Sequence, residues 1–400
     1  MANSTLITMM CSAAVALTAT GAAPEHFQPC AKELLANSIE LEKNAHNLNV
    51  IYFTGNDMQP TPESDRRLSE LLLYLQQYYG KEMERNGFGK RSFGLARTEN
   101  GNVDIYYIKG KNAHKSYAYG TGHGACIHEV EEWFKAHPGK KMSSHTFVIM
   151  PTWQDEGYSD KNPGGVPFYG LGRYCFALDY TDFDIKHLGK KTREGKLLTK
   201  WYGGFAHELG HGMNLPHNNG TISLNKAMGT ALMGAGNYTF GMSPTYLTKA
   251  SCALLSNTEI FVSAGTPHRF YTMEKEPTVY QTTFERKGDM LELYMEVSAD
   301  VACINAYVQE PPYAVNQDYE AVAFTCNMGT NQEGKRVAGV MIPLNELGNL
   351  RNRDNGELAL DVLIQTYEGS RFRWRIPFDL SKQPAGTQIN TGKPVFHRGY

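Results

Sequence analysis

The residues best suited to chemistry lie in segment 207–217, which reads HELGHGMNLPH. On a helix, residues four apart share one face, so His207 and His211 can direct ring nitrogens to one point about 2 Å away. Imidazole nitrogens at this spacing are typical ligands of a catalytic zinc ion. Glu208 lies about 100° further round the helix, where its carboxylate can act as general base for a zinc-bound water. The segment therefore predicts hydrolytic zinc chemistry.

A third histidine can join the ligand set only if the helix ends before it. His217 follows His207 by ten residues, which in an unbroken helix would place it roughly 15 Å further along the axis. The intervening residues favour a helix end. Gly212 weakens the helix, Asn214 tolerates positive φ, and Pro216 pushes the residue before it out of helical dihedrals. We therefore expect His217 to fold back onto the metal.

This arrangement resembles the metzincin clan of zinc metallopeptidases, whose signature is HExxHxxGxxH. Asn214 stands at the position of the signature glycine, and asparagine is a frequent second choice where the backbone needs positive φ. The resemblance implies that His207, His211 and His217 bind one catalytic zinc ion. It also implies that Glu208 is the catalytic base of a peptidase.

Metzincins also carry a methionine turn, which forms a hydrophobic floor beneath the metal. Met233 is the best match, because the glycines after it permit a tight reversal. Some metzincins add a tyrosine shortly after this methionine that supports the transition state. No tyrosine stands two residues after Met233, so Tyr238 is the weaker candidate for that role and is otherwise expected to line the pocket.

Two alternatives use the same residues differently. In a gluzincin-like peptidase Glu259 would replace His217 as the third ligand, although no helical pattern surrounds it. In a surface glycan- or protein-binding module, the zinc domain would be a non-catalytic scaffold. Structural zinc sites usually close with a fourth protein ligand, often cysteine, and neither a cysteine nor an acid adjoins His217.

A second, partial pattern begins at His128. It has Glu132 where the second histidine should stand, so we expect the charged face of an ordinary helix there and no metal site.

Composition bounds the organisation and the partners of the chain. Its 400 residues, 41% of them hydrophobic, are sufficient for two cores, and we expect two domains. A formal net charge of -2 without long charged runs disfavours nucleic acid as a partner.

Residues 6–20 form an apolar run followed by small residues, typical of a secretory signal peptide at 1–22. No other run approaches the length of a membrane span, so we expect a secreted, periplasmic or cell-surface protein.

Cysteine usage is consistent with export. Removal of the signal, with Cys11, would leave six of the seven cysteines, an even number. We expect disulfides first between Cys303 and Cys326 and next between Cys126 and Cys175. The alternative is that most of these cysteines are buried free thiols that pack as small hydrophobic residues.

The first half of the chain predicts strands and helices in mixed order. They are strands 49–54, 92–97, 103–109, 146–150 and 171–179, and helices 63–86, 124–136, 200–212 and 243–257, with a hairpin turn at Asn100-Gly101. This order is compatible with an α+β metzincin-like catalytic domain at residues 24–258, a mixed twisted sheet with backing and active-site helices. By the same resemblance, the strand near 173–178 would be the edge that pairs with extended substrate. The loop 155–165 has residues that calcium prefers, but its spacing fits no standard calcium loop and favours a solvated turn.

The second half changes in character. Seven short strands are expected, at 278–284, 290–297, 302–309, 321–327, 337–343, 358–367 and 371–378. They predict a β-sandwich of immunoglobulin-like or carbohydrate-binding-like type at residues 259–400, which could bind glycan. Every candidate catalytic residue lies before about residue 240. The preferred interpretation is an exported zinc endopeptidase that acts on proteins or glycoproteins, with Glu208 as general base.

Overall fold

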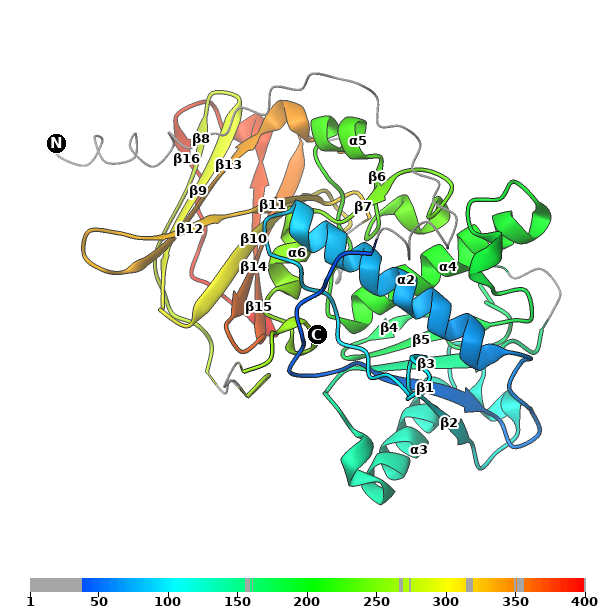
Figure 1. Ribbon diagram of the computed structural model, residues 1–400. Coiled ribbons are helices and arrows are strands. Elements are labelled where there is room, and N and C mark those ends of the chain that lie inside the picture. Colours follow the sequence, from blue (N-terminus) through cyan, green and yellow to red (C-terminus); the bar gives the residue numbers. More distant parts are fainter. Residues whose placement is uncertain are drawn as a thin grey trace.

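The computed structural model describes residues 38–154, 159, 161–265, 269–272, 275–313, 319–348, 350 and 356–398. Figure 1 shows an α/β half, followed along the chain by a half built of antiparallel strands. The predicted signal peptide lies outside the described residues, as do Cys30 and residues 155–158 and 160 of the loop considered for calcium. Within the described ranges, none of the helices combines the length and the apolar character needed to span a bilayer.

The first half is organised around one mixed five-stranded sheet. Its strands are β1 (Asn49–Thr54), β2 (Ile105–Lys109), β3 (Thr146–Pro151), β4 (Gly170–Leu171) and β5 (Tyr174–Asp179), in the order β2-β1-β3-β5-β4. Only β4 runs antiparallel to its neighbour, β5. Every residue of β1 and β3 is buried, as expected for central parallel strands that are covered on both faces.

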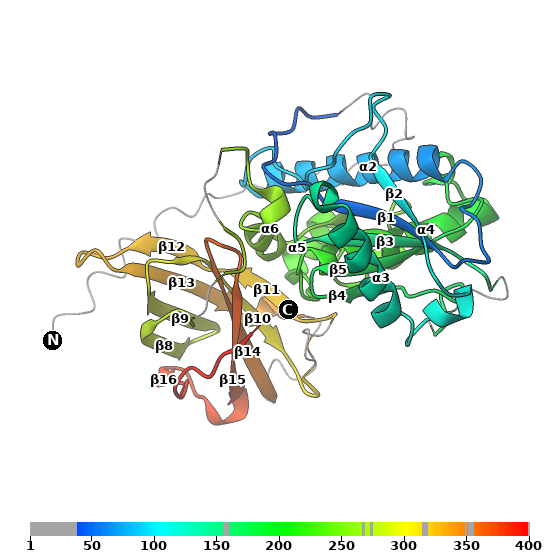
Figure 2. The ribbon, with the colours of Figure 1, turned by 90° about the horizontal axis from the view of Figure 1, so that it is seen from below.

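Three long helices cover this sheet. They are α2 (Ser64–Arg85), α3 (His123–Ala136) and α4 (Arg193–Gly212). In Figure 1, α2 and α4 lie on one side of the sheet and α3 on the other, and Figure 2 shows α3 from below. The predicted leucine stripe of α2, which begins at Leu68, is buried in the core. Thr192 caps the start of α4 by accepting a hydrogen bond from the amide of Gly195 at 3.1 Å.

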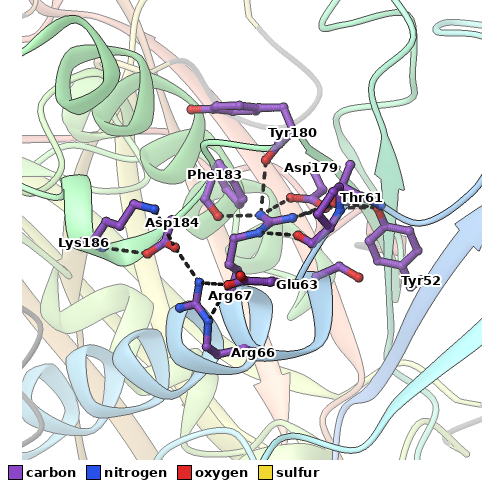
Figure 3. Close-up of polar contacts among 12 residues, drawn as sticks. Tyr52, Thr61, Glu63, Arg66, Arg67, Asp179, Tyr180, Phe183, Asp184 and Lys186 are labelled. Carbon is purple, nitrogen blue, oxygen red and sulfur yellow. Dashed lines mark hydrogen bonds and ion pairs between the residues drawn. The ribbon is translucent and has the colours of Figure 1, made fainter.

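A buried ion pair ties α2 to the end of β5 (Figure 3). Arg67 Nη1 lies 2.7 Å from Asp179 Oδ1, and both side chains are buried. Tyr52 donates to Asp179 Oδ2 at 3.0 Å, and the Thr61 hydroxyl also bonds to this carboxylate. Arg67 further donates to the carbonyl of Phe183 at 2.8 Å. Because both charges are paired and hydrogen-bonded, their burial is tolerated, and they fix the start of the segment that leads from β5 to α4.

Shorter elements complete the first half. They are helices α5 (Ile222–Met228) and α6 (Lys249–Leu255), strands β6 (Thr230–Ala231) and β7 (Thr245–Tyr246), and 3₁₀ turns η2 (His114–Tyr117), η3 (Pro138–Lys140), η4 (Ile185–His187), η5 (Ala235–Tyr238) and η6 (Glu259–Phe261).

The second half contains two five-stranded antiparallel sheets. One has the order β11-β10-β14-β15-β17 and the other β12-β13-β9-β8-β16. The bounds are β8 (Val279–Lys287), β9 (Met290–Val297), β10 (Val301–Gln309), β11 (Val322–Thr325), β12 (Asn327–Thr330), β13 (Arg336–Pro343), β14 (Glu357–Thr366), β15 (Arg371–Asp379), β16 (Thr387–Gln388) and β17 (His397–Arg398), with 3₁₀ turns η7 (Leu344–Glu346) and η8 (Leu380–Lys382). Leu293 of the second sheet and Leu360 of the first belong to one buried cluster, so the two sheets share a core.

The two halves also share hydrophobic packing at their boundary. Cys303 and Tyr307 of β10 and Leu363 of β14 belong to the same buried cluster as the core of the α/β half. Asn305 Nδ2 donates to the carbonyl of Ala250 in α6 at 2.9 Å. The core of the first half therefore includes side chains from beyond residue 258.

Several predicted elements differ from the structure. The turn expected at Asn100-Gly101 is present, since Arg97 and Val103 form an antiparallel bridge around it and Gly101 has φ of 82°. The two long strands expected on either side of it are wrong: the first makes only isolated bridges, and β2 pairs in parallel with β1. The strand expected at 171–179 is divided by a reversal at Gly172, where φ is 62°, so the sheet edge is β4 and not the strand near 173–178. The closing helix is shorter than expected, because β7 occupies part of its predicted range.

The predicted disulfides are also wrong. Cys126, Cys175, Cys252, Cys303 and Cys326 are free and buried in the described part of the chain. The Cys303 thiol instead contacts the Gln365 side chain at 3.4 Å. These thiols pack as small hydrophobic residues, which was the alternative interpretation.

Candidate metal centre

Helix α4 directs its two histidines toward one point. Because His207 and His211 stand one turn apart on the same face, their Nε2 atoms lie 3.1 Å from each other. His207 is fully buried and His211 is partly exposed. This confirms that the helix brings the two rings together.

The chain reverses directly after this helix. Asn214 has φ of 65°, and its amide donates to the carbonyl of His211 at 2.7 Å, while the amide of Leu215 donates to Gly210 at 2.9 Å. This pair of bonds is a Schellman helix end, with asparagine in the left-handed position that glycine most often occupies. The reversal places His217 Nε2 3.0 Å from His211 Nε2. All three rings offer a nitrogen within 4.8 Å of one another.

Hydrogen bonds from the Nδ1 atoms of two of the rings determine which ring nitrogen carries the lone pair. His207 Nδ1 donates to the carbonyl of Leu232 at 2.8 Å, and His211 Nδ1 donates to the carbonyl of Leu215 at 2.7 Å. A neutral imidazole that donates through Nδ1 carries its lone pair on Nε2. Burial lowers the pKa of both rings to about 3, so they are neutral near pH 7. Converging lone pairs repel one another unless a cation lies between them, and the site therefore fits a metal ion.

Glu208 lies beside the triad, in contact with the edge strand. Its Oε2 accepts a hydrogen bond from the amide of Gly170 in β4 at 2.9 Å. Burial raises the pKa of this carboxyl to about 8, against a smaller lowering by the bond from Gly170. A Cβ at position 170 would overlap the Cβ of His211, so only glycine lets β4 approach α4 this closely.

Met233 packs against α4 at the residue before His211. A Cβ at Gly210 of α4 would lie 2.5 Å from the Met233 sulfur, and the Met233 side chain is buried. The Met233 carbonyl accepts a hydrogen bond from the amide of Asn218 at 3.1 Å, directly after His217. The preceding residue, Leu232, supplies the carbonyl that orients His207. The segment thus packs on the helix and bonds to His207 and to the residue after His217.

Solved structures with the same architecture exist. Wild-type OgpA from Akkermansia muciniphila matches in two crystal forms, at 49% and 47% identity with TM-scores of 0.83 and 0.82, covering 90% and 92% of this chain and 99% and 100% of OgpA. Catalytically inactive OgpA, in complex with an O-glycopeptide (glycodrosocin) substrate, matches at 48% identity and a TM-score of 0.83, covering 90% of this chain and 99% of OgpA. The chain belongs to the OgpA family. No protein-family model and no curated protein matches it.

In this OgpA-family chain, the second half supplies a residue to the site. The ring of Tyr319 stacks on His217, with centroids 4.0 Å apart and an interplanar angle of 26°, and lies 5.6 Å from the ring of His207. Neither spacing nor motif pointed to Tyr319, because it lies far from the histidines in sequence. Tyr238, the tyrosine considered from sequence, is 51% exposed on η5.

Glu259 and His128, which were also considered from the sequence, lie outside the histidine cluster. Glu259 accepts a hydrogen bond from the amide of Ser144 at 2.8 Å and lies 3.7 Å from His46, so it is not the third ligand. The ligand position that the gluzincin alternative assigned to it is occupied by His217. His128 stands exposed on α3, as expected for an ordinary helix.

Proposed function

We propose that this chain is an exported, zinc-dependent endopeptidase of the metzincin clan that hydrolyses peptide bonds of O-glycosylated proteins. The observation that carries the proposal is the convergence of three imidazole nitrogens, at 3.0 and 3.1 Å, beside the carboxyl of Glu208. Membership of the OgpA family supports the substrate class, since inactive OgpA was crystallised with an O-glycopeptide substrate. The apolar run and small residues at 1–22 support export.

Zinc is the metal that suits this donor set best. Hydrolytic zinc sites use three protein ligands and leave one position open, and here the cluster of described residues consists of His207, His211 and His217. A zinc ion held by these residues supplies a Lewis acid that acidifies water and polarises a carbonyl. Calcium has no supporting observation among the described residues.

Glu208 is the group that moves protons. As general base, its carboxylate takes a proton from the attacking water and then delivers it to the leaving amine nitrogen. Its burial against β4 raises its pKa to about 8, and a nearby cation would lower this value toward the ionised form that a base requires. The bond from the Gly170 amide holds the carboxyl beside the triad during both transfers.

The proposal assigns separate roles to the two halves. Residues 24–258 form the metzincin-like catalytic domain, with Met233 as its methionine turn, and residues 259–400 form a β-sandwich. The shared core of the two antiparallel sheets supports the sandwich. Extended substrate would pair with the β4 edge, which lies against Glu208 and His211. Binding of glycan by the sandwich is part of the same proposal.

The test combines metal analysis with cleavage by the purified full chain. We expect one zinc per chain, and cleavage of an O-glycopeptide but not of the same peptide without glycan. Glu208→Gln keeps size and hydrogen bonding but removes the base, so zinc should remain while hydrolysis falls at least about a hundredfold. Zinc binding and glycopeptide binding without any cleavage by the wild type would favour the binding-module alternative.

A further inference from the structure

We propose that Tyr271, in the segment that joins the two halves, is a positioning residue for the metal centre. It acts through His145 on the end of α4, where the chain reverses to bring His217 to the triad. This inference rests on the proposed function, because it assumes that the triad binds zinc. Tyr271 is far from the motif in sequence, and its hydroxyl bonds to His145 and not to a histidine of the metal cluster.

A continuous chain of hydrogen bonds links the joining segment to α4. The amide of Glu259 lies 3.2 Å from Tyr271 Oη, which lies 2.6 Å from His145 Nε2. His145 Nδ1 lies 2.7 Å from the carbonyl of Gly212, the last residue of α4. His145 is fully buried just before β3.

The direction of every bond in this chain is determined. The carbonyl of Gly212 can only accept, so His145 Nδ1 carries the hydrogen and its Nε2 accepts. Tyr271 therefore donates to His145 and accepts from the amide of Glu259. Burial lowers the pKa of His145 to about 3, so this neutral tautomer persists at neutral pH. Loss of the single hydroxyl would leave two buried polar groups unsatisfied.

Contacts from both halves hold Tyr271 in an unfavourable backbone conformation. Its φ is 58°, which side-chain-bearing residues seldom adopt, and its amide donates to the carbonyl of Glu368 at 2.9 Å. Arg173, between β4 and β5, lies 4.5 Å from the centroid of the Tyr271 ring. A Cβ at Gly369 would lie 2.7 Å from Tyr271 Cε1, so the β14–β15 turn also packs on this ring. Strain maintained by several partners is typical of a residue held for function.

The same turn makes a second link to the helix end. Arg371, the first residue of β15, is buried, and its Nη2 lies 3.4 Å from the carbonyl of Met213. A cation at a helix C-terminus is favourable because the last carbonyls carry partial negative charge. The carbonyls of Gly212 and Met213 are thus both held from outside the helix, immediately before the reversal at Asn214.

These contacts influence the position of His217, because only a short reversal separates it from the end of α4. Only two residues separate Asn214 from His217, so a shift of the helix end moves the third ligand directly. Groups that orient metal ligands from outside the coordination shell change metal affinity or activity by about 10- to 100-fold when mutated. Tyr271 acts one step further out, so we expect an effect at the low end of that range.

The test is Tyr271→Phe in the full chain, which keeps the ring and removes the hydroxyl. We expect zinc to dissociate about tenfold faster into a chelator, and kcat on the O-glycopeptide to fall with KM unchanged. Tyr307→Phe is the matched control, since it removes a buried hydroxyl that contacts Asn305 at 3.4 Å at the same boundary between the halves. It should leave both quantities at wild-type values. Thermal unfolding of the metal-free variants checks that each one folds.

A second pair of variants keeps the inference testable if Tyr271→Phe does not fold. Gly369→Ala crowds the Tyr271 ring, whereas Gly288→Ala places a Cβ at another positive-φ position with no atom within 4 Å. We expect faster zinc loss only in Gly369→Ala. Wild-type zinc retention and kcat in folded Tyr271→Phe would overturn the inference while leaving the proposed function intact. A wild-type chain that neither binds zinc nor cleaves would instead overturn the proposed function itself.

Discussion

The phenol ring of Tyr319 stacks on the imidazole of His217 at a centroid distance of 4.0 Å. The backbone next to Tyr319 is held in place, because the amide of Asn219 donates to the carbonyl of Ala321 at 2.7 Å and the amide of Ala323 donates to Asn219 at 3.0 Å. The segment after the third histidine and the segment after Tyr319 therefore run side by side. A residue from the second half thus forms one wall of the metal centre.

The first prediction tests whether the ring of Tyr319 or its hydroxyl contributes to metal affinity. Tyr319→Ala removes the surface that packs on His217, so we expect metal affinity to fall about tenfold, as for other groups that orient a ligand. Tyr319→Phe keeps the stack and should retain wild-type metal affinity. Competition with a chromophoric chelator measures both. Equal losses in the two variants would show that the hydroxyl, and not the ring, supports the site.

The third ligand provides the second prediction. His217→Ala removes one of three neutral nitrogen donors, so zinc content measured after dialysis should drop sharply. His128→Ala is the matched control, because His128 begins a similar sequence pattern but stands exposed on α3. Full zinc occupancy in His217→Ala would leave two histidines as the site and would contradict the metzincin assignment.

The third prediction concerns the approach of β4 to α4. Gly170→Ala forces the edge strand away from His211 and from the Glu208 carboxyl, so we expect kcat to fall by about a hundredfold, as for an ångström-scale misplacement. Gly172→Ala, in the same hairpin, meets no atom within 4 Å but carries a positive-φ penalty at φ of 62°. Steady-state kinetics should show a larger fall in kcat for Gly170→Ala than for Gly172→Ala. Similar kcat values would contradict the prediction, because only Gly170→Ala crowds His211.

The fourth prediction is a pH dependence of stability. Burial, with smaller contributions from Arg173 and Arg371, lowers the pKa of His145 from 6.5 to about 3. Between these values the unfolded chain binds a proton at His145 that the folded chain does not, so acid destabilises the fold. The stability due to neutral His145 is complete above about pH 6.5 and is lost as pH falls toward 3.

His145→Gln removes this titration but retains an amide donor for Gly212. The variant should be less stable than wild type at pH 7, and the difference in Tm should shrink as the pH falls below 6.5. Tyr271 and Glu259 are present in both proteins, and Glu259 joins the hydrogen-bonded chain through its backbone amide. A Tm difference that stays constant from pH 7 to pH 4 would contradict the prediction.

Local spacing was sufficient to predict the histidine triad. The separation of His207 and His211 is a property of one helical turn, and the reversal depends on Asn214 and its immediate neighbours. Most of the strands and the long helices followed from hydrophobic periodicity for the same reason, since each pattern is complete within one element. These features needed no knowledge of distant contacts.

Where distant partners compete with local signals, the sequence was not sufficient. Asn100-Gly101 forms the predicted turn, with an antiparallel bridge between Arg97 and Val103, yet β2 pairs along its length with β1, because pairing is decided by which apolar surface the strand can bury. Cysteine spacing likewise could not show that Cys303 and Cys326 remain free thiols. Disulfide formation depends on the distance and direction of two side chains in the folded chain.

The sequence by itself determined the convergence of the three histidines at the end of α4, because they and Glu208 lie within eleven consecutive residues whose geometry the backbone imposes. Only the tertiary structure decided what surrounds them. Tyr319, Tyr271 and Arg371 all come from beyond residue 258, and no local periodicity relates them to the histidines. Tyr319 reaches the histidines, and Tyr271 and Arg371 reach His145 and the end of α4, because the two halves bury apolar surface against each other, which is a property of the whole fold.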